Sequence, residues 1–176
     1  MAGATAPCQV TVAPVTPELA SAVRAIRVQP AQYAYVGDVA VHLIDCEASP
    51  HSEPMAILAG GDVVGFYRID LRPGAIAGGD YGGACALLRN LQIDRSRQGL
   101  GLGTLALRAC VQDLERRHPR LRVLALTVNC INAAALRTYR RTGFVDSGRF
   151  RYGGRSGPQH LMFRRLGREG VGESAA

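Results

Sequence analysis

The residues best suited to chemistry in this chain are a glycine run and an asparagine–tyrosine pair downstream. The run, residues 97–104, reads Arg-Gln-Gly-Leu-Gly-Leu-Gly-Thr and follows the strand-like residues 85–93. Glycines at alternate positions leave successive backbone N–H groups free to converge on one point. A helix-like segment begins at Thr104, and its positive dipole end faces the same point. The pattern predicts a phosphate-binding turn.

The second feature is the pair Asn132 and Tyr139, followed by Gly143-Phe144. Seven residues are two helical turns, so both polar side chains share one face of the predicted helix over residues 132–141. A tyrosine hydroxyl there could donate a proton to a ligand. Taken alone, Tyr139 would be interpreted as a packing residue with a satisfied hydroxyl. A catalytic interpretation of Tyr139 therefore depends on the presence of the other motifs in the chain.

Two familiar phosphate-binding loops do not fit the glycine run. A P-loop requires a lysine, and the chain contains none. A dinucleotide-binding turn requires G-x-G-x-x-G and an acidic residue about 20 positions later. Here Thr104 replaces the third glycine, and the later region is the apolar Val123–Leu126. The remaining alternatives are a different phosphate ligand and a plain strand-to-helix turn.

The rest of the chain alternates between strand-like and helix-like segments. Alternating apolar residues indicate strands over residues 8–15, 55–59, 63–71, 85–93, 123–128, 144–151 and 160–165. Helical spacing indicates helices over residues 18–27, from Pro30 through Leu43, over 104–118 and over 132–141, with a glycine-rich loop at 73–83. This order predicts one α+β domain over residues 8–166 around a mixed sheet, with residues 1–7 and 167–176 as flexible tails.

The composition suits a soluble globular domain. The chain has 176 residues, 47% of them hydrophobic, and no apolar run approaches the roughly 18 residues of a transmembrane helix. Residues 1–7 are too short for a signal peptide, so we expect a cytoplasmic protein without a membrane partner. The five cysteines lack a C-x-x-C pair and the four histidines lack ligand spacing, so no metal site is expected.

The net charge of +7 raises the question of a nucleic-acid partner, since all 21 basic residues are arginine. The nearest candidate is Arg149–Arg168, where arginines accompany aromatic residues. The alternation and glycines of that segment favour two strands joined by a turn. No nucleic acid is expected as a partner.

Together the two motifs resemble those of the GNAT acyltransferase superfamily. Residues 98–103 match Q/R-x-x-G-x-G/A, and residues 132–144 match N-x-x-A-x-x-x-Y-x-x-x-G-F, in the order that this N-acetyltransferase superfamily shows. The resemblance covers residues 8–166. It implies a mixed, mostly antiparallel sheet of about seven strands, flanked by four helices and split between the fourth and fifth strands.

The resemblance also implies acetyl-coenzyme A as acyl donor. The backbone of Leu91 and Ile93 would pair with the pantetheine arm, the N–H groups of residues 98–104 would hold the pyrophosphate, and Tyr139 would be the general acid. The donor-binding residues implied are Leu91, Gln92, Ile93, Arg97, Gln98, Gly99, Leu100, Gly101, Leu102, Gly103, Thr104, Asn132, Ala135 and Tyr139.

The acceptor is expected to be a primary amine that attacks the thioester directly, and no general base is assigned. Asp38, His42 and Asp45 fall at i, i+4 and i+7, which predicts either an anionic wall for a cationic amine, with His42 as proton relay, or an ordinary solvated helix face. A weaker resemblance to the spermine/spermidine acetyltransferase-like branch rests on residues 28–36, 93–99 and 161–163. It implies a small polyamine-like acceptor.

Other functions stay open at this point. A protein N-terminal or lysine acetyltransferase would need an open groove for a peptide, and a non-catalytic acyl-CoA-binding module would show no turnover. A homodimer is a further hypothesis for the assembly.

Overall fold

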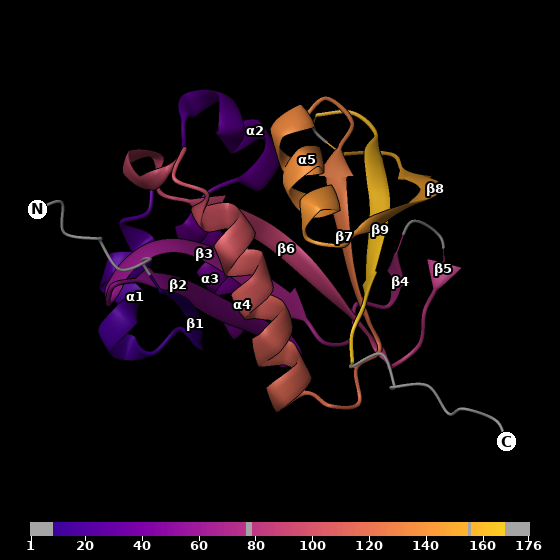
Figure 1. Ribbon diagram of the computed structural model, residues 1–176, viewed down its shortest axis with the longest axis horizontal. Helices are drawn as coiled ribbons and strands as arrows, with labels where there is room; N and C mark the ends of the chain where they lie inside the picture. The colour runs from indigo at the N-terminus through magenta and orange to yellow at the C-terminus, as the bar shows by residue number, and fades with distance from the viewer. Residues whose placement is uncertain (1–8, 77–78, 155, 168–176) are drawn as a thin grey trace, which may run out of the picture.

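The computed structural model describes residues 9–76, 79–154 and 156–167, which form a seven-stranded sheet in the order β1-β2-β3-β6-β7-β9-β8 (Figure 1). The last strand of the chain, β9, thus lies between β7 and the edge strand β8. Adjacent strands are antiparallel except for β6 and β7. The bounds are β1 (Val10–Pro14), β2 (Ser52–Ala59), β3 (Asp62–Asp70), β6 (Cys85–Ile93), β7 (Val123–Asn129), β8 (Val145–Arg151) and β9 (Gln159–Arg165).

The sheet splits between its fourth and fifth strands, as expected from the sequence. Pairing of β6 with β7 covers only Cys85–Leu88 against Val123–Leu126. Beyond it the register of β6 against β3 shifts, and Asn90 adopts a positive φ of 55°. A bulge of this kind bends a strand and ends its regular pairing. The two strands diverge beyond their contact (Figure 1).

Helices cover both faces of the sheet. On one face α4 (Leu102–Arg117) buries Leu107 and Leu114 against strand residues such as Leu124. On the other, α1 (Pro17–Arg24) and α3 (Val39–Glu47) enclose a smaller core. The helix α5 (Ala133–Arg141) follows β7 and lies beside the N-terminal part of α4. No helix in the described ranges is long and apolar enough to cross a bilayer.

The predicted second helix is interrupted, which corrects the sequence interpretation. Residues 30–32 form a 3₁₀ turn, η1, followed by the single turn α2 (Tyr33–Val36). Gly37 has φ of 69°, and a Cβ there would come within 3.0 Å of His42 Nε2. The chain therefore leaves the helix at Gly37 and restarts at Asp38, whose carboxylate accepts a hydrogen bond from the Ala40 N–H at 2.7 Å.

A second difference concerns the loop over residues 73–83. It contains two short paired strands, β4 (Ala75–Ile76) and β5 (Gly79–Asp80). Of the predicted tails, residues 1–7 and 168–176 lie outside the described residues. Gly167 is described, and its N–H donates to a Glu115 carboxylate oxygen at 3.0 Å.

Candidate active site

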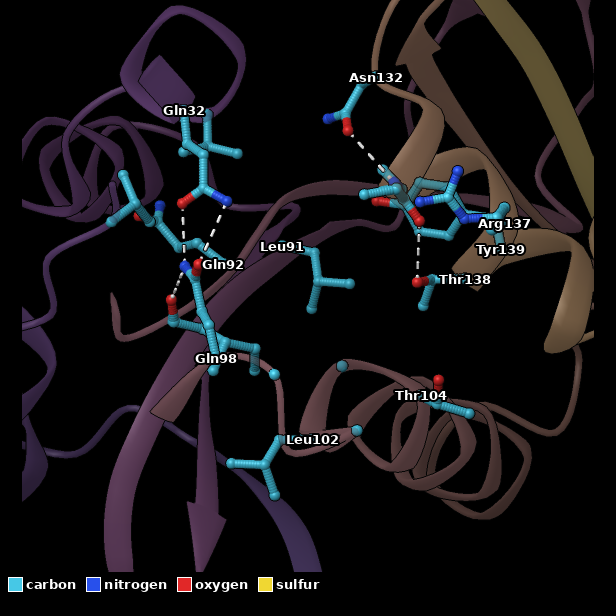
Figure 2. Close-up of a pocket in the computed structure, with 18 of the residues that line it drawn as sticks. Gln32, Leu91, Gln92, Gln98, Leu102, Thr104, Asn132, Arg137, Thr138 and Tyr139 are labelled. Carbon is cyan, nitrogen blue, oxygen red and sulfur yellow. Dashed lines mark hydrogen bonds between the residues drawn. The ribbon is translucent and has the colours of Figure 1, made fainter. Parts of the chain in front are cut away.

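A cavity of about 580 Å³ lies between β6 and α5, where the sheet is split, and extends to the start of α4 (Figure 2). It brings together every predicted donor-binding residue except Leu100, which is 65% exposed and does not line the cavity. Sequence reasoning missed the other residues that line it. These are Val28, Gln32, Tyr35, Val36, Ala134, Arg137, Thr138 and Arg141.

The turn before α4 offers unpaired backbone N–H groups. Gly99 and Gly101 have φ of 80° and 74°, and no atom lies within 4 Å of where their Cβ atoms would be. Thr104 and Leu105 donate their N–H groups to the Gly101 carbonyl. Within the described ranges the N–H groups of residues 98–103 have no hydrogen-bond partner. Open space, unpaired donors and a helix N-terminus fit a pyrophosphate.

The charge of the cavity matches an anionic ligand. Arg97, Arg137 and Arg141 line it, and no carboxylate or histidine does so among the described residues. The Arg97 guanidinium also forms an exposed ion pair with the Asp62 carboxylate, at a distance of 3.3 Å. Arg137 and Arg141 form no ion pair within the described part of the chain. Their i, i+4 spacing on a helix that starts at the asparagine motif was the signal that could have identified them.

The free edge of β6 is positioned for backbone pairing. The Asp94 N–H donates to the Val64 carbonyl on β3 at 2.8 Å. Because the direction of the backbone groups alternates along a strand, Leu91 and Ile93 present theirs to the opposite edge, where β7 has diverged. The Ile93 carbonyl on that edge accepts a hydrogen bond from Gln98 Nε2 at 2.9 Å. The N–H groups of this edge fit the predicted contact with an extended donor arm.

The asparagine and glycine motifs position α5. Asn132 Oδ1 caps the helix by accepting the Ala135 N–H at 3.2 Å, which leaves its Nδ2 group for the cavity (Figure 2). Gly143 ends the helix with φ of 86°, and a Cβ there would lie 3.2 Å from the Arg164 guanidinium. The next residue, buried Phe144, packs edge-on against the Tyr139 ring with centroids 5.7 Å apart.

Tyr139 is half-buried in the cavity wall. Its hydroxyl forms no hydrogen bond with any described residue. Burial raises the pKa of this phenol to about 12, so the group stays protonated at physiological pH. A protonated hydroxyl in the wall of a cavity that the glycine turn also lines can donate a proton to a ligand bound there.

The predicted acceptor residues are placed elsewhere, because none of Asp38, His42 and Asp45 lines the cavity. Asp38 caps α3, and Asp45 pairs with Arg68 across 3.4 Å. His42 Nε2 bonds to the Val36 carbonyl, and burial lowers the pKa of its imidazole, so the ring is neutral at physiological pH. The structure does not bring these three side chains together as an anionic wall at the cavity.

A further part of the cavity wall comes from α2, which contacts a segment distant in sequence. Tyr35 and Val36 of α2 line the cavity, and the β8–β9 connection reaches α2 from across the split. There Ser156 Oγ donates to the Ala34 carbonyl at 2.8 Å, and Asn129 Nδ2 donates to the Ser156 carbonyl. A contact across 122 residues leaves no pattern in the sequence.

Comparison with known proteins decides the family. The model of the acetyltransferase (GNAT) family matches residues 20–144. The chain belongs to this family. Membership confirms that the chain is an acyltransferase and that the expected donor is the acetyl-CoA of the family.

Two curated relatives and one solved structure are informative. The spermine/spermidine N(1)-acetyltransferase of Bacillus subtilis (strain 168) is 29% identical over 140 residues, which are 80% of this chain and 90% of the relative. The probable spermine N(1)-acetyltransferase of Bacillus subtilis subsp. natto (strain BEST195) matches to the same extent. The structure of AAC(6')-Ib in complex with parmomycin and acetyl-CoA has a TM-score of 0.72 at 20% identity, over 89% of this chain and 93% of that one, and confirms the fold.

Proposed function

We propose that this enzyme transfers an acetyl group from acetyl-CoA to a primary amine of a small, polyamine-like molecule. The observation that carries the proposal is the protonated Tyr139 hydroxyl, which has no hydrogen-bond partner in the described part of the chain. It lies in the cavity that also presents N–H groups of residues 98–103 with no partner in that part of the chain. The curated relatives, named for spermine and spermidine, support the class of acceptor.

Backbone groups do most of the donor binding in this proposal. The N–H groups of residues 98–103 and the start of α4 hold the pyrophosphate, and the free edge of β6 at Leu91 and Ile93 pairs with the pantetheine arm. An N–H group on this edge polarises the reacting carbonyl. Asn132 Nδ2 is free to donate from the opposite wall. Bound acetyl-CoA supplies a thioester whose carbonyl carbon bonds to the amine nitrogen as its carbon–sulfur bond breaks.

Tyr139 donates its hydroxyl proton to the departing sulfur. An ordinary thiol has a pKa near 8.5, so transfer from a phenol with a pKa of about 12 would cost about 5 kcal/mol in free energy. Burial disfavours the charged form of a thiol as it does that of a phenol, as the raised pKa of the Cys110 thiol in the core illustrates. Partial burial of the leaving sulfur next to Tyr139 therefore lowers the cost of the transfer.

Water is the acceptor of the amine proton in this account. No histidine or carboxylate among the described residues lines the cavity, so no side chain there can act as the base. The attacking amine loses its surplus proton to water, and Tyr139 regains one from water after each turnover. The catalytic group and its environment return to their starting state.

The contact between Ser156 and Ala34 favours a small acceptor over a peptide. It joins the β8–β9 connection to α2 on the acceptor side of the split, where a peptide would need an open groove. The acceptor then enters through the remaining gap with its amine leading.

The test is a thiol-release assay with acetyl-CoA and spermidine, with mass spectrometry of the product. Wild-type protein should form acetylspermidine, and Tyr139→Phe should lower kcat by roughly 100-fold or more while leaving the Kd for CoA within about twofold. Tyr152→Phe is the matched control, because Tyr152 is 75% exposed at the end of β8. Full activity of Tyr139→Phe would contradict the proposed proton donor.

A further inference from the structure

Two glutamine carboxamides join the phosphate turn to the acceptor side of the cavity (Figure 2). Gln98 Nε2 donates to Gln32 Oε1 at 2.9 Å, and Gln32 Nε2 returns a bond to Gln98 Oε1 at 3.3 Å. We refer to these two side chains as the amide pair. They lie 66 residues apart in the chain, and both line the cavity.

Each member of the amide pair is also tied to its own wall. Gln98 Nε2 donates a second bond to the Ile93 carbonyl at 2.9 Å, on the β6 edge expected to pair with the donor arm. Gln32 Oε1 accepts the Gln29 N–H at 2.9 Å and so closes the η1 turn. The 3₁₀ turn continues directly into α2, whose Tyr35 and Val36 line the acceptor side. One side-chain contact thus connects strand, phosphate turn and acceptor wall.

The amide pair is not what anchors these segments in the fold. Just upstream, the Arg95 N–H donates to the Arg27 carbonyl at 2.6 Å, and the Arg27 N–H donates to an Asp94 carboxylate oxygen at 2.9 Å. These bonds hold the turn before the glycine run against the segment that leads to η1. Loss of the amide pair therefore frees the cavity walls without detaching the segments.

We infer that the amide pair is a positioning device that transmits donor binding to the acceptor wall. Pyrophosphate bound by the N–H groups of residues 98–103 fixes the turn and with it the Gln98 side chain. Gln98 then fixes Gln32, so that η1 and α2 take one position against the cavity. Because coupling between two sites is reciprocal, an amine bound at α2 tightens donor binding by the same factor. The inference rests on the proposed function for the identity of the donor.

Hydrogen–deuterium exchange with added CoA tests the coupling without knowledge of the acceptor. In the wild-type protein CoA should slow exchange both in residues 98–105 and in residues 30–37. In Gln32→Ala, CoA should still protect residues 98–105, while the protection of residues 30–37 is lost. Gln98→Ala breaks the pair from the other side and should show the same loss, whereas Gln112→Ala, exposed on α4, should behave as wild type.

A binding experiment measures the size of the effect. In wild-type protein, spermidine should tighten the Kd for CoA about fivefold, and in Gln32→Ala the factor should fall to about one. Protection of residues 30–37 that persists in both glutamine variants, or is absent in the wild-type protein, would overturn the inference. Failure of CoA to protect residues 98–105 in the wild-type protein would instead refute the donor site of the proposed function.

Discussion

The two sides of the cavity are built in different ways. The donor side consists largely of backbone: free N–H groups at the glycine turn and the unpaired edge of β6 beyond Leu88. The side proposed for the acceptor consists of side chains and turns from η1 and α2, and the contact of Ser156 with Ala34 joins α2 to the β8–β9 connection. Backbone groups can bind the same donor in any protein with this local geometry. Side chains from distant segments can differ freely from one relative to the next.

This difference explains why the reaction class is clearer than the acceptor. A positive-φ glycine, a helix cap and a bulge each constrain a few neighbouring residues, so they leave local patterns in a sequence. The proposed acceptor wall depends on contacts between residues 66 and 122 positions apart, which leave no local pattern. The donor side should therefore respond to changes in backbone conformation, and the acceptor side to changes in single side chains.

The largest expected effect on donor binding comes from the glycine turn. Gly99→Ala combined with Gly101→Ala places side chains at φ of 80° and 74°, which costs roughly 1 kcal/mol at each position. The free turn can relax away from this conformation, so donor binding must restore it, and we expect the Kd for CoA to rise about 30-fold. Calorimetric titration with CoA measures it.

Gly74→Ala is the matched control for the glycine variant. Gly74 also has a positive φ of 64° and open space around its Cβ position, but it lies outside the cavity. Its replacement should leave the Kd for CoA unchanged. Equal loss of affinity in both variants would show that general strain, and not the phosphate turn, is responsible.

The next effect tests the arginines of α5. Arg141 lines both the donor cavity and a second cavity, which Arg108, Arg164 and Arg165 also line. We expect this group to contact the 3′-phosphate of CoA, so that dephospho-CoA binds about tenfold more weakly than CoA. Arg141→Ala should remove most of this difference and Arg140→Ala, exposed on the same helix, should not. Equal affinities for the two nucleotides would contradict the assignment.

The smallest expected effect concerns alkaline pH. A tyrosine acts as a general acid only while protonated, and the raised pKa of Tyr139, about 12, extends that range upward from the ordinary value near 10. The kcat with spermidine should therefore show no descending limb up to pH 10.5. A fall in kcat that begins below pH 10 in the wild-type protein, and that Tyr139→Phe does not show, would contradict the high pKa of Tyr139.

Much of the fold and of the donor side could be predicted from the sequence. The glycine turn and the helix from Asn132 to Tyr139 follow from spacing and turn chemistry, and the split of the sheet is implied by the resemblance to the GNAT superfamily. The second helix could not, because Gly37 breaks it at a position where the apolar spacing continues on both sides. Asp38, His42 and Asp45 do share one helix, but they do not line the cavity, because spacing along a helix does not show which surface that helix faces.

The contacts of the proposed acceptor wall could not be predicted from the sequence for a different reason. Gln32 reaches the cavity only because the chain returns to it at Gln98, and Ser156 meets α2 only in the folded protein. Neither contact alters the local pattern of its own segment. The two arginines of α5 are an intermediate case, with a helical spacing that is visible once the neighbouring cavity is known.

An amine panel tests the central claim most directly. With saturating acetyl-CoA, free thiol is followed for spermidine, spermine, a mono-amine, a peptide with a free N-terminus and a lysine peptide, in wild type and in Ser156→Ala. We expect turnover of the small amines and little with either peptide, and a rise in the KM for spermidine of about fivefold when the Ser156 bond is lost. Turnover of a peptide in preference to the small amines, or no thiol release with any amine, would contradict the account.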